Sequence, residues 1–158
     1  MLDVHGESRT AWPASDALCA ALQVINHLQD CAKDYRELDR VYLPADTLKA
    51  CGASVEMLGA DPPDPAIAAT VRALSARNAG LLTVSRAFAG QVKDLRLALE
   101  VGAIQTLAES LNRRLRTRDP FGAESHHSRV EALGVGLAGV SRTLAGRLAS
   151  RLFAAGGP

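Results

Sequence analysis

Four polar residues recur at helical spacing near the start of the chain: Gln23, Asn26, Asp30 and Asp34. Their separations of three or four positions place them within about 80° of one another on a helix wheel of 100° per residue. Apolar residues occupy most of the rest of that wheel. We therefore predict a polar stripe along an otherwise apolar helix, and we expect this stripe to face an enclosed space rather than open solvent.

The two carboxylates of the polar stripe indicate a metal site. Asp30 and Asp34 are one helical turn apart, where like charges repel by about 0.2–0.5 kcal/mol even in water, and burying them unpaired costs far more. A hard divalent cation is the simplest neutraliser, and Mg²⁺ is typically held by one or two carboxylates with waters and substrate phosphates. We expect both carboxylates and the Asn26 amide to bind Mg²⁺, while Gln23 adds a neutral oxygen or orients metal-bound water.

A short motif follows directly after this predicted helix. Arg40, Tyr42 and Pro44 alternate with apolar residues, and the proline disfavours helix at the residue before it. The side chains of Arg40 and Tyr42 could therefore reach an anionic group that the metal holds. An isolated Asp-x-x-x-Asp pair is more often a solvated helix face. Here the two aspartates share one face of the helix with the amides of Gln23 and Asn26, and the Arg-x-Tyr-x-Pro motif follows directly, so a binding site is favoured.

Residues 23–34 and 39–44 together resemble the second aspartate-rich signature of the squalene and phytoene synthase family. That signature has Gln, Asn, Asp and a further acidic residue at these spacings, followed by Arg-x-(Tyr/Phe)-x-Pro. Residues 27–29 and Cys31 make the segment most similar to the hydroxysqualene synthases of the bacterial hopanoid pathway. Two stretches farther along the chain also resemble that branch, residues 77–82 and 94–100.

The resemblance implies an all-α isoprenoid-synthase fold around a deep apolar cavity, in which two aspartate-rich helices hold Mg²⁺ on the diphosphate of a prenyl substrate, presqualene or farnesyl diphosphate. It implies catalytic roles for Asp30, Asp34 and Tyr42. The substrate diphosphate would be contacted by four side chains: Gln23, Asn26, Arg40 and Tyr42. In the hydroxysqualene branch, presqualene diphosphate loses its diphosphate, the cation rearranges, and water captures it without a hydride donor.

Members of that family are about twice as long as these 158 residues, and their first aspartate-rich motif lies in their N-terminal half. We therefore expect the C-terminal portion of the fold. Because carboxylates on one side neutralise too little diphosphate charge, the chain alone should be an impaired enzyme that self-associates or needs a complementing N-terminal half. Two alternatives stay open, namely a non-catalytic helical interaction module that needs a partner and, among enzymes, a presqualene diphosphate or phytoene synthase.

Composition favours one helical domain over residues 1–158. Hydrophobic residues make up 47% and charged residues 22%, which is enough apolar surface to argue against disorder. The net charge of only +1 argues against nucleic acid as a partner. Because aromatic residues are scarce and Ala, Leu and Arg dominate, helix is favoured over strand. The predicted fold is all-α, a partial isoprenoid-synthase bundle of about four long helices plus short ones.

Hydrophobic periodicity predicts where the helices lie. Long helices are expected over residues 16–38, 67–88, 92–115 and 127–153, and short ones over 47–51 and 55–58. In the third long helix five side chains are predicted to face inward: Leu95, Leu99, Ile104, Leu107 and Leu111. In the last long helix, four small residues predict close packing against a neighbouring helix: Gly134, Gly136, Ala138 and Gly139.

The location is expected to be cytoplasmic, because three cysteines without metal-like spacing are typical of a reducing compartment. The longest apolar stretch, residues 132–140, is far short of the ~20 residues of a membrane span. The last helix carries three arginines, Arg142, Arg147 and Arg151, and they alternate with Leu144, Leu148 and Leu152. They form either a solvated basic face, which is the commoner case, or a peripheral contact with an anionic membrane.

Overall fold

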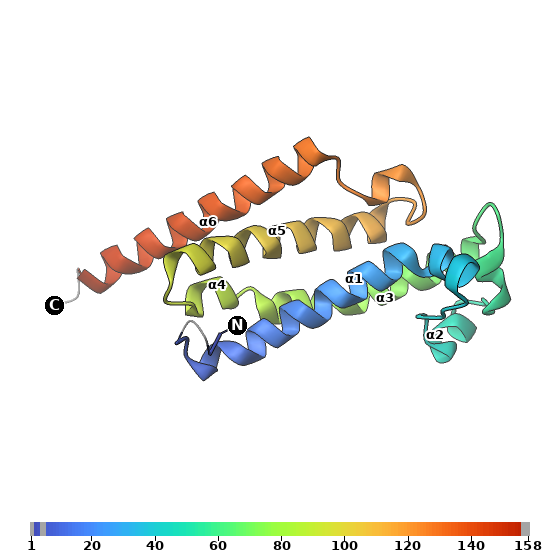
Figure 1. Cartoon of the computed structure of the whole chain (residues 1–158), viewed down its shortest axis with the longest axis horizontal. Coiled ribbons are helices and arrows are strands. Elements are labelled where there is room, and N and C mark those ends of the chain that lie inside the picture. The colour runs from blue at the N-terminus through green and yellow to red at the C-terminus, as the bar shows by residue number, and fades with distance from the viewer. Residues whose placement is uncertain (1, 4–5, 156–158) are drawn as a thin grey trace.

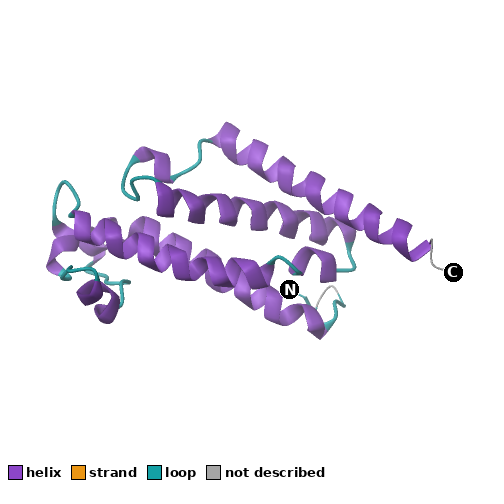
Figure 2. Ribbon diagram, turned by 180° about the vertical axis from the view of Figure 1, so that it is seen from behind, coloured by secondary structure: helices purple, strands orange, loops and turns teal. Residues whose placement is uncertain are grey.

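The computed structural model describes residues 2–3 and 6–155, and this part of the chain contains helices and no strands (Figures 1 and 2). The elements follow in this order: η1 (Arg9–Ala11), α1 (Trp12–Leu38), α2 (Ala45–Ala50), η2 (Glu56–Gly59), α3 (Pro65–Ser85), α4 (Phe88–Gln91), α5 (Leu95–Thr117), η3 (Ala123–Ser125) and α6 (Arg129–Ala155). The predicted all-α class is confirmed. No described helix combines the length and the apolarity that a bilayer crossing requires.

The long helices run roughly parallel to the long axis of the molecule and pack side by side in chain order (Figure 1). α1 packs on α3, α3 on α5, and α5 on α6, so that α6 forms the outermost layer (Figure 1). The short elements α2 and η2 gather at one end, beside the end of α1 and the start of α3 (Figure 2). This arrangement brings the chain that follows α1 back beside the C-terminal half of that helix.

The first long helix begins at Trp12 rather than at the predicted Asp16, and its predicted end at Leu38 is confirmed. Pro13 lies in the first turn, where its fixed φ suits helix and its missing N–H is no loss. The helix ends because Asp39 adopts a left-handed conformation with φ of 53°, and its N–H returns to the carbonyl of Tyr35 at 3.1 Å. This turn directs the following residues back toward α1.

α3 begins with a strong local signal. The Asp64 carboxylate accepts the N–H of Ala66 at 2.7 Å, and Pro65 is the first helical residue. One side of this helix faces the core, where its residues are buried or half-buried: Ile67, Val71, Leu74, Asn78, Leu81, Leu82 and Ser85. The helix ends at Ser85, and the predicted extension to residue 88 is a separate turn, α4.

The predicted inward face of α5 is wrong in part. Leu95 and Ile104 are exposed, whereas Ala98, Val101 and Ala108 are buried. The reason is that α5 is covered from two sides, by α3 and by α6. Small side chains at both contacts let the neighbouring helices approach, so the large aliphatic residues do not by themselves mark the buried surface.

α6 packs on α5 through glycine. A Cβ atom on Gly139 would lie 2.5 Å from the carbonyl oxygen of Gly102, and a Cβ on Gly102 would collide with the side chain of Thr143. The predicted close packing is therefore confirmed at Gly139. It is wrong at Gly134 and Gly136, where an added Cβ would meet nothing within 4 Å. Because the small residues face α5, the large apolar side chains of α6 point away from it.

Candidate functional site

The loop after α1 folds back onto the polar stripe. The N–H of Arg40 donates to the carbonyl of Asp34 at 3.2 Å, which continues the turn that Asp39 begins. Two residues later, the Tyr42 hydroxyl donates to Asp34 Oδ2 at 2.7 Å. Leu43 is buried and anchors this segment in the core. The structure thus joins two of the predicted site residues, Asp34 and Tyr42, by a direct hydrogen bond.

The same tyrosine also contacts α1 about two turns closer to the N-terminus, at His27. The Tyr42 ring stacks on the imidazole of His27, with ring centroids 4.1 Å apart and ring planes inclined by 5°. The Gln23 side-chain amide donates to His27 Nε2 at 3.0 Å. Gln23, His27, Tyr42 and Asp34 therefore form one contact chain along α1. Asn26, Asp30 and Arg40 lie outside this chain and are exposed.

The prediction of an enclosed space around the stripe is wrong for this part of the chain. Gln23, Asn26 and Asp30 are exposed, and Asp34 is half-buried. The apolar sides of the helix are covered instead, because Ile25 and Leu28 are buried against the neighbouring helices. Packing against these helices is enough to explain why α1 is apolar on several sides, so an enclosed space over the stripe is not required. The polar residues lie on the side of the helix that remains uncovered.

The stripe offers hard oxygen ligands on one side of a metal. Within residues 2–3 and 6–155, no group of three or more His, Cys, Asp or Glu side chains converges as a metal cage. Asp30 and Asp34 present two carboxylates one turn apart, and the bond from Tyr42 to Oδ2 leaves Oδ1 of Asp34 as an acceptor. Two carboxylates with neighbouring amides fit Mg²⁺, which usually completes its shell with water and substrate phosphate.

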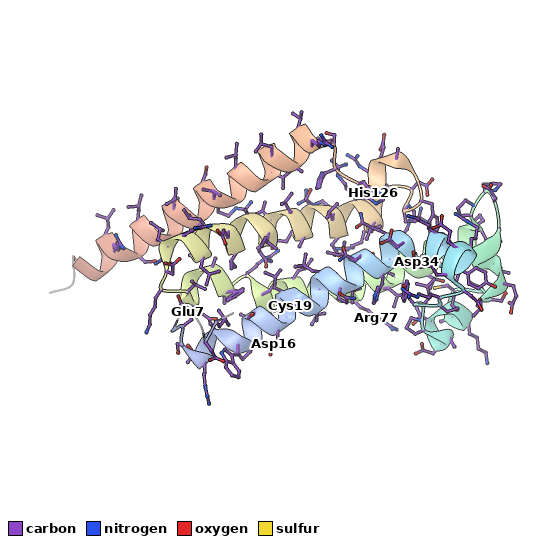
Figure 3. All side chains as sticks on the ribbon, viewed as in Figure 1. Glu7, Asp16, Cys19, Asp34, Arg77 and His126 are labelled. Atoms are coloured by element: carbon purple, nitrogen blue, oxygen red, sulfur yellow. The ribbon has the colours of Figure 1, made fainter. Side chains whose placement is uncertain are left out.

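A pocket of about 240 Å³ adjoins the stripe between α1, α3 and the loop. Its polar groups come from four residues: His27, Tyr42, Arg77 and Asn78. Its apolar lining comes from five residues: Val24, Leu28, Pro44, Leu74 and Leu81. The Arg77 guanidinium donates to Thr47 Oγ1 at 3.3 Å, which holds the side chain at the edge of the pocket. Figure 3 shows Arg77 and Asp34 toward the end of the molecule that carries α2.

Arg77 is the residue that reasoning from the sequence did not place in the site. A single arginine on a helix is usually a solvated surface charge, but the structure shows that Arg77 lines this pocket. The available signal was its position three residues after Leu74 and directly before Asn78, both on the inward stripe. That position puts Arg77 at the border between the buried and the exposed face.

A buried amide pair fixes the helices beneath this pocket. Asn78 Nδ2 donates to the carbonyl of Ala21 at 3.2 Å and to Asn112 Oδ1 at 3.1 Å. Asn112 in turn donates to the carbonyl of Ser75 at 3.0 Å. Buried amides that satisfy backbone carbonyls in this way select one relative position of α1, α3 and α5. The spacing between the stripe on α1 and Arg77 on α3 is thereby set.

On the buried side of α1, behind the stripe, the Cys31 thiol is uncharged. Cys31 is fully buried, its thiol donates to the carbonyl of Leu28 at 3.3 Å, and burial raises the pKa of this thiol to about 11. The nearby carboxylates of Asp30 and Asp34 also raise it. Cys31 therefore stays a neutral packing residue at neutral pH, and it adds no thiolate to the carboxylates.

The family model of squalene/phytoene synthase matches residues 1–132. The chain is 54% identical over 131 residues to a hydroxysqualene synthase of Rhodopseudomonas palustris, in an alignment that covers 83% of this chain and 45% of that protein. It is 46% identical over 151 residues to a hydroxysqualene synthase of Sinorhizobium fredii, covering 96% and 52% respectively.

A more distant relative is a phytoene synthase of Thermus thermophilus, which is 32% identical over 126 residues, covering 80% of this chain and 43% of that protein. No solved structure gives a significant match. The chain thus spans about half the length of the curated relatives that it matches. Because the family model covers most of the chain, including the polar stripe and the loop after it, the chain belongs to the squalene/phytoene synthase family.

Proposed function

We propose that this chain contributes one side of a Mg²⁺-dependent prenyl-diphosphate site of the hydroxysqualene synthase type. The observation that carries the proposal is the hydrogen bond from Tyr42 to Asp34, which joins the loop motif to the carboxylate stripe. Two relatives that are 46–54% identical bear the name hydroxysqualene synthase. The substrate class would therefore be a prenyl diphosphate, presqualene diphosphate in this branch.

Each site residue has a defined task in this proposal. Asp30 and Asp34 hold the cation, assisted by Asn26, and the cation when bound neutralises charge on the departing diphosphate. Tyr42 orients the Asp34 carboxylate through its hydroxyl, and in this proposal the same residue also contacts the diphosphate. Gln23 positions His27 against the Tyr42 ring.

Cationic side chains would complete the anion site. Arg40 is exposed directly after the turn at Asp39, and a guanidinium there can form paired hydrogen bonds with phosphate oxygens. Arg77 would approach from the other side of the 240 Å³ pocket. The apolar lining of the pocket suits the part of a prenyl chain nearest to the diphosphate.

Activity of the chain alone would be low. Gln23, Asn26 and Asp30 are exposed, so water screens the charges that catalysis depends on. A polypeptide that carries the remainder of the relatives' length would cover this face and supply the opposing ligands. The same exposure supports the alternative of a non-catalytic interaction module, and the phytoene synthase of Thermus thermophilus keeps a phytoene or presqualene diphosphate synthase as the alternative among enzymes.

The experiment measures binding and chemistry separately. Titration calorimetry with inorganic diphosphate and Mg²⁺ should show Mg²⁺-dependent binding that Asp30→Ala and Asp34→Ala each weaken by roughly tenfold or more. The matched control is Asp16→Ala, because Asp16 is an exposed aspartate at the other end of the same helix (Figure 3). The same two variants, and not the Asp16→Ala control, should slow the release of diphosphate from presqualene diphosphate. Binding and release that are indifferent to Asp30→Ala and Asp34→Ala would contradict the proposal.

A further inference from the structure

A groove of about 490 Å³ lies between α4 and α6, and four arginines line it: Arg86, Arg142, Arg147 and Arg151. We call it the arginine groove. α4 lies toward the end of the molecule opposite to α2, whereas Asp34 lies toward the end that carries α2 (Figures 1 and 3). The arginine groove shares no lining residue with the pocket beside the polar stripe. It is therefore a separate feature of the surface.

α6 presents its arginines to the groove from both flanks. Thr143 and Gly146 line the groove and lie about 60° apart on a wheel of 100° per residue. Relative to Thr143, Arg151 lies about 80° to one side and Arg142 about 100° to the other. Both arginines are exposed. Because arginine side chains are long, these two can close over the groove from opposite sides.

The other two arginines are held in place by the protein itself. The Arg147 guanidinium donates to the carbonyls of Val92 and Lys93 at 2.7 and 3.0 Å. Arg86 donates through Nε to Glu109 at 2.7 Å, which leaves its two terminal nitrogens as donors. Backbone carbonyls orient a guanidinium without cancelling its charge. An anion that arrives at these two side chains therefore has less conformational freedom to remove.

The groove concentrates positive charge. No acidic side chain lines it within the described chain. The acid that contacts its arginines is Glu109, which is 2.7 Å from Arg86 and 4.0 Å from Arg142. Four guanidiniums against one carboxylate leave an excess of three positive charges at this place, although the net charge of the whole chain is only +1.

The shape and chemistry of the groove suit a compact anion with several charges. A guanidinium forms paired hydrogen bonds with phosphate oxygens, and a volume of about 490 Å³ is in the range of small-molecule sites. Gly90 and Gly146 keep room within it, because a Cβ added at either would meet nothing within 4 Å. An acidic protein segment spreads its carboxylates along an extended chain, whereas linked phosphates gather their charges in one place.

We propose that the arginine groove binds a soluble oligophosphate, a compound with two or three linked phosphate groups, without a metal ion. Arg86 and Arg147 hold the anion on the fixed side, and Arg142 and Arg151 close over it. This inference goes beyond the proposed function, because it needs neither Mg²⁺ nor any residue of the polar stripe.

The test is titration calorimetry of the full chain with inorganic triphosphate in the presence of EDTA, which withholds Mg²⁺ from the polar stripe. One saturable site is expected, with weaker binding of inorganic phosphate and weaker binding at higher salt concentration. Arg151→Gln should weaken triphosphate binding about tenfold, because it removes a hydrogen-bond donor that carries charge. Arg129→Gln is the matched control, because Arg129 is an exposed arginine of α6 that does not line the groove.

A steric variant tests the location without changing the charge. Gly146→Leu should abolish binding, because the added side chain occupies the groove. Gly134→Leu is its control, since Gly134 is also an exposed glycine of α6 where an added Cβ meets nothing within 4 Å, but it lies outside the groove. Circular dichroism checks that each variant is folded.

The proposal is overturned if triphosphate shows no saturable binding in EDTA, or if Arg151→Gln and Gly146→Leu bind it as tightly as the wild type. Equal losses in the two control variants would also overturn it. So would binding to phosphatidylglycerol vesicles without binding to triphosphate, because the phosphate would then be that of a lipid headgroup. Failure of the prenyl-diphosphate proposal would leave these results unchanged, since that site is assayed with Mg²⁺.

Discussion

At the scale of single residues, the site depends on how one carboxylate is held. Asp34 is half-buried and accepts the Tyr42 hydroxyl at 2.7 Å, a length typical of a hydrogen bond to a charged acceptor. Stacking on His27 restrains the Tyr42 ring, so the hydroxyl is already in place. A carboxylate oriented before a cation arrives loses less freedom on binding it.

Tyr42→Phe should weaken Mg²⁺-dependent binding of inorganic diphosphate about fivefold, because it removes one hydrogen bond worth about 1 kcal/mol to the Asp34 carboxylate. The stacking on His27 is kept, so the midpoint of thermal unfolding should fall by no more than about 2–4 °C, the shift that 1 kcal/mol produces in a domain of this size. Titration calorimetry and circular dichroism measure the two effects. Tyr35→Phe is the control, because Tyr35 is a half-buried tyrosine near the end of α1 that packs on Gly59. Equal losses in both variants would contradict a specific role for the Tyr42 hydroxyl.

The sequence predicts the register of the polar stripe because a helix wheel depends only on spacing. It predicts that Tyr42 and Asp34 belong to one site, but not that they touch, since the contact requires the left-handed turn at Asp39. Arg77 was not assigned, because it comes from another helix, whose rotation is set by the buried Asn78–Asn112 pair. Long-range placement of this kind has no local signature.

At the scale of elements, the connection from α5 to α6 has its own stabilising cluster. The Arg114 guanidinium donates to the carbonyls of Glu124 and His126 and to the Glu131 carboxylate, at 3.2, 2.7 and 2.9 Å. Ser128 and Glu131 form a capping box at the start of α6, in which each side chain accepts the other residue's N–H. The hydrogen bonds from Ser128 and Arg114 lower the pKa of Glu131 to about 2.

Because the pKa of Glu131 is about 2 in the folded chain and about 4.5 otherwise, its contribution to stability is present above pH 4.5 and is lost as the pH falls toward 2. Glu131→Gln should therefore lower the free energy of unfolding at neutral pH, and the difference from wild type should shrink as the pH falls through this window. Urea unfolding at several pH values measures it. Glu124→Gln is the control, because Glu124 is mostly exposed and its ion pair with Arg118, at 3.4 Å, is longer than the 2.9 Å pair of Glu131 with Arg114. A difference that does not vary with pH would contradict the carboxylate's role.

Element boundaries were predictable where caps and breakers are local, as at Leu38, and to within two residues at Pro65. The buried side of a helix was less predictable where several faces are covered. The leucine pattern of α5 predicted one inward face, yet Leu95 and Ile104 are exposed. α5 contacts its neighbours through alanine and glycine, which carry no amphipathic signal. Periodicity identifies a helix more reliably than it identifies which side is buried.

At the scale of the whole molecule, α1 and α6 have equal lengths and unequal surroundings. Each is 27 residues long. α1 is covered by α3, α5 and η2, and it buries residues along most of its length, whereas α6 lies in the outer layer on α5 and α4. Helix length therefore cannot account for a difference in their local stability, and the number of covered faces can.

Hydrogen exchange followed by mass spectrometry should separate these two helices. Backbone amides of residues 18–32 in α1 should be protected to nearly the free energy of global unfolding, because their helix face is buried on several sides. Amides of residues 144–152 in α6 should exchange at least about tenfold faster, since that end can open without exposing the core beneath α5. The capping box at Ser128 and Glu131 should keep the first turns of α6 slower than its last turns. Uniform protection along both helices would mean that α6 belongs to the same cooperative unit as the other long helices, and its outward apolar face would then need a covering partner in solution.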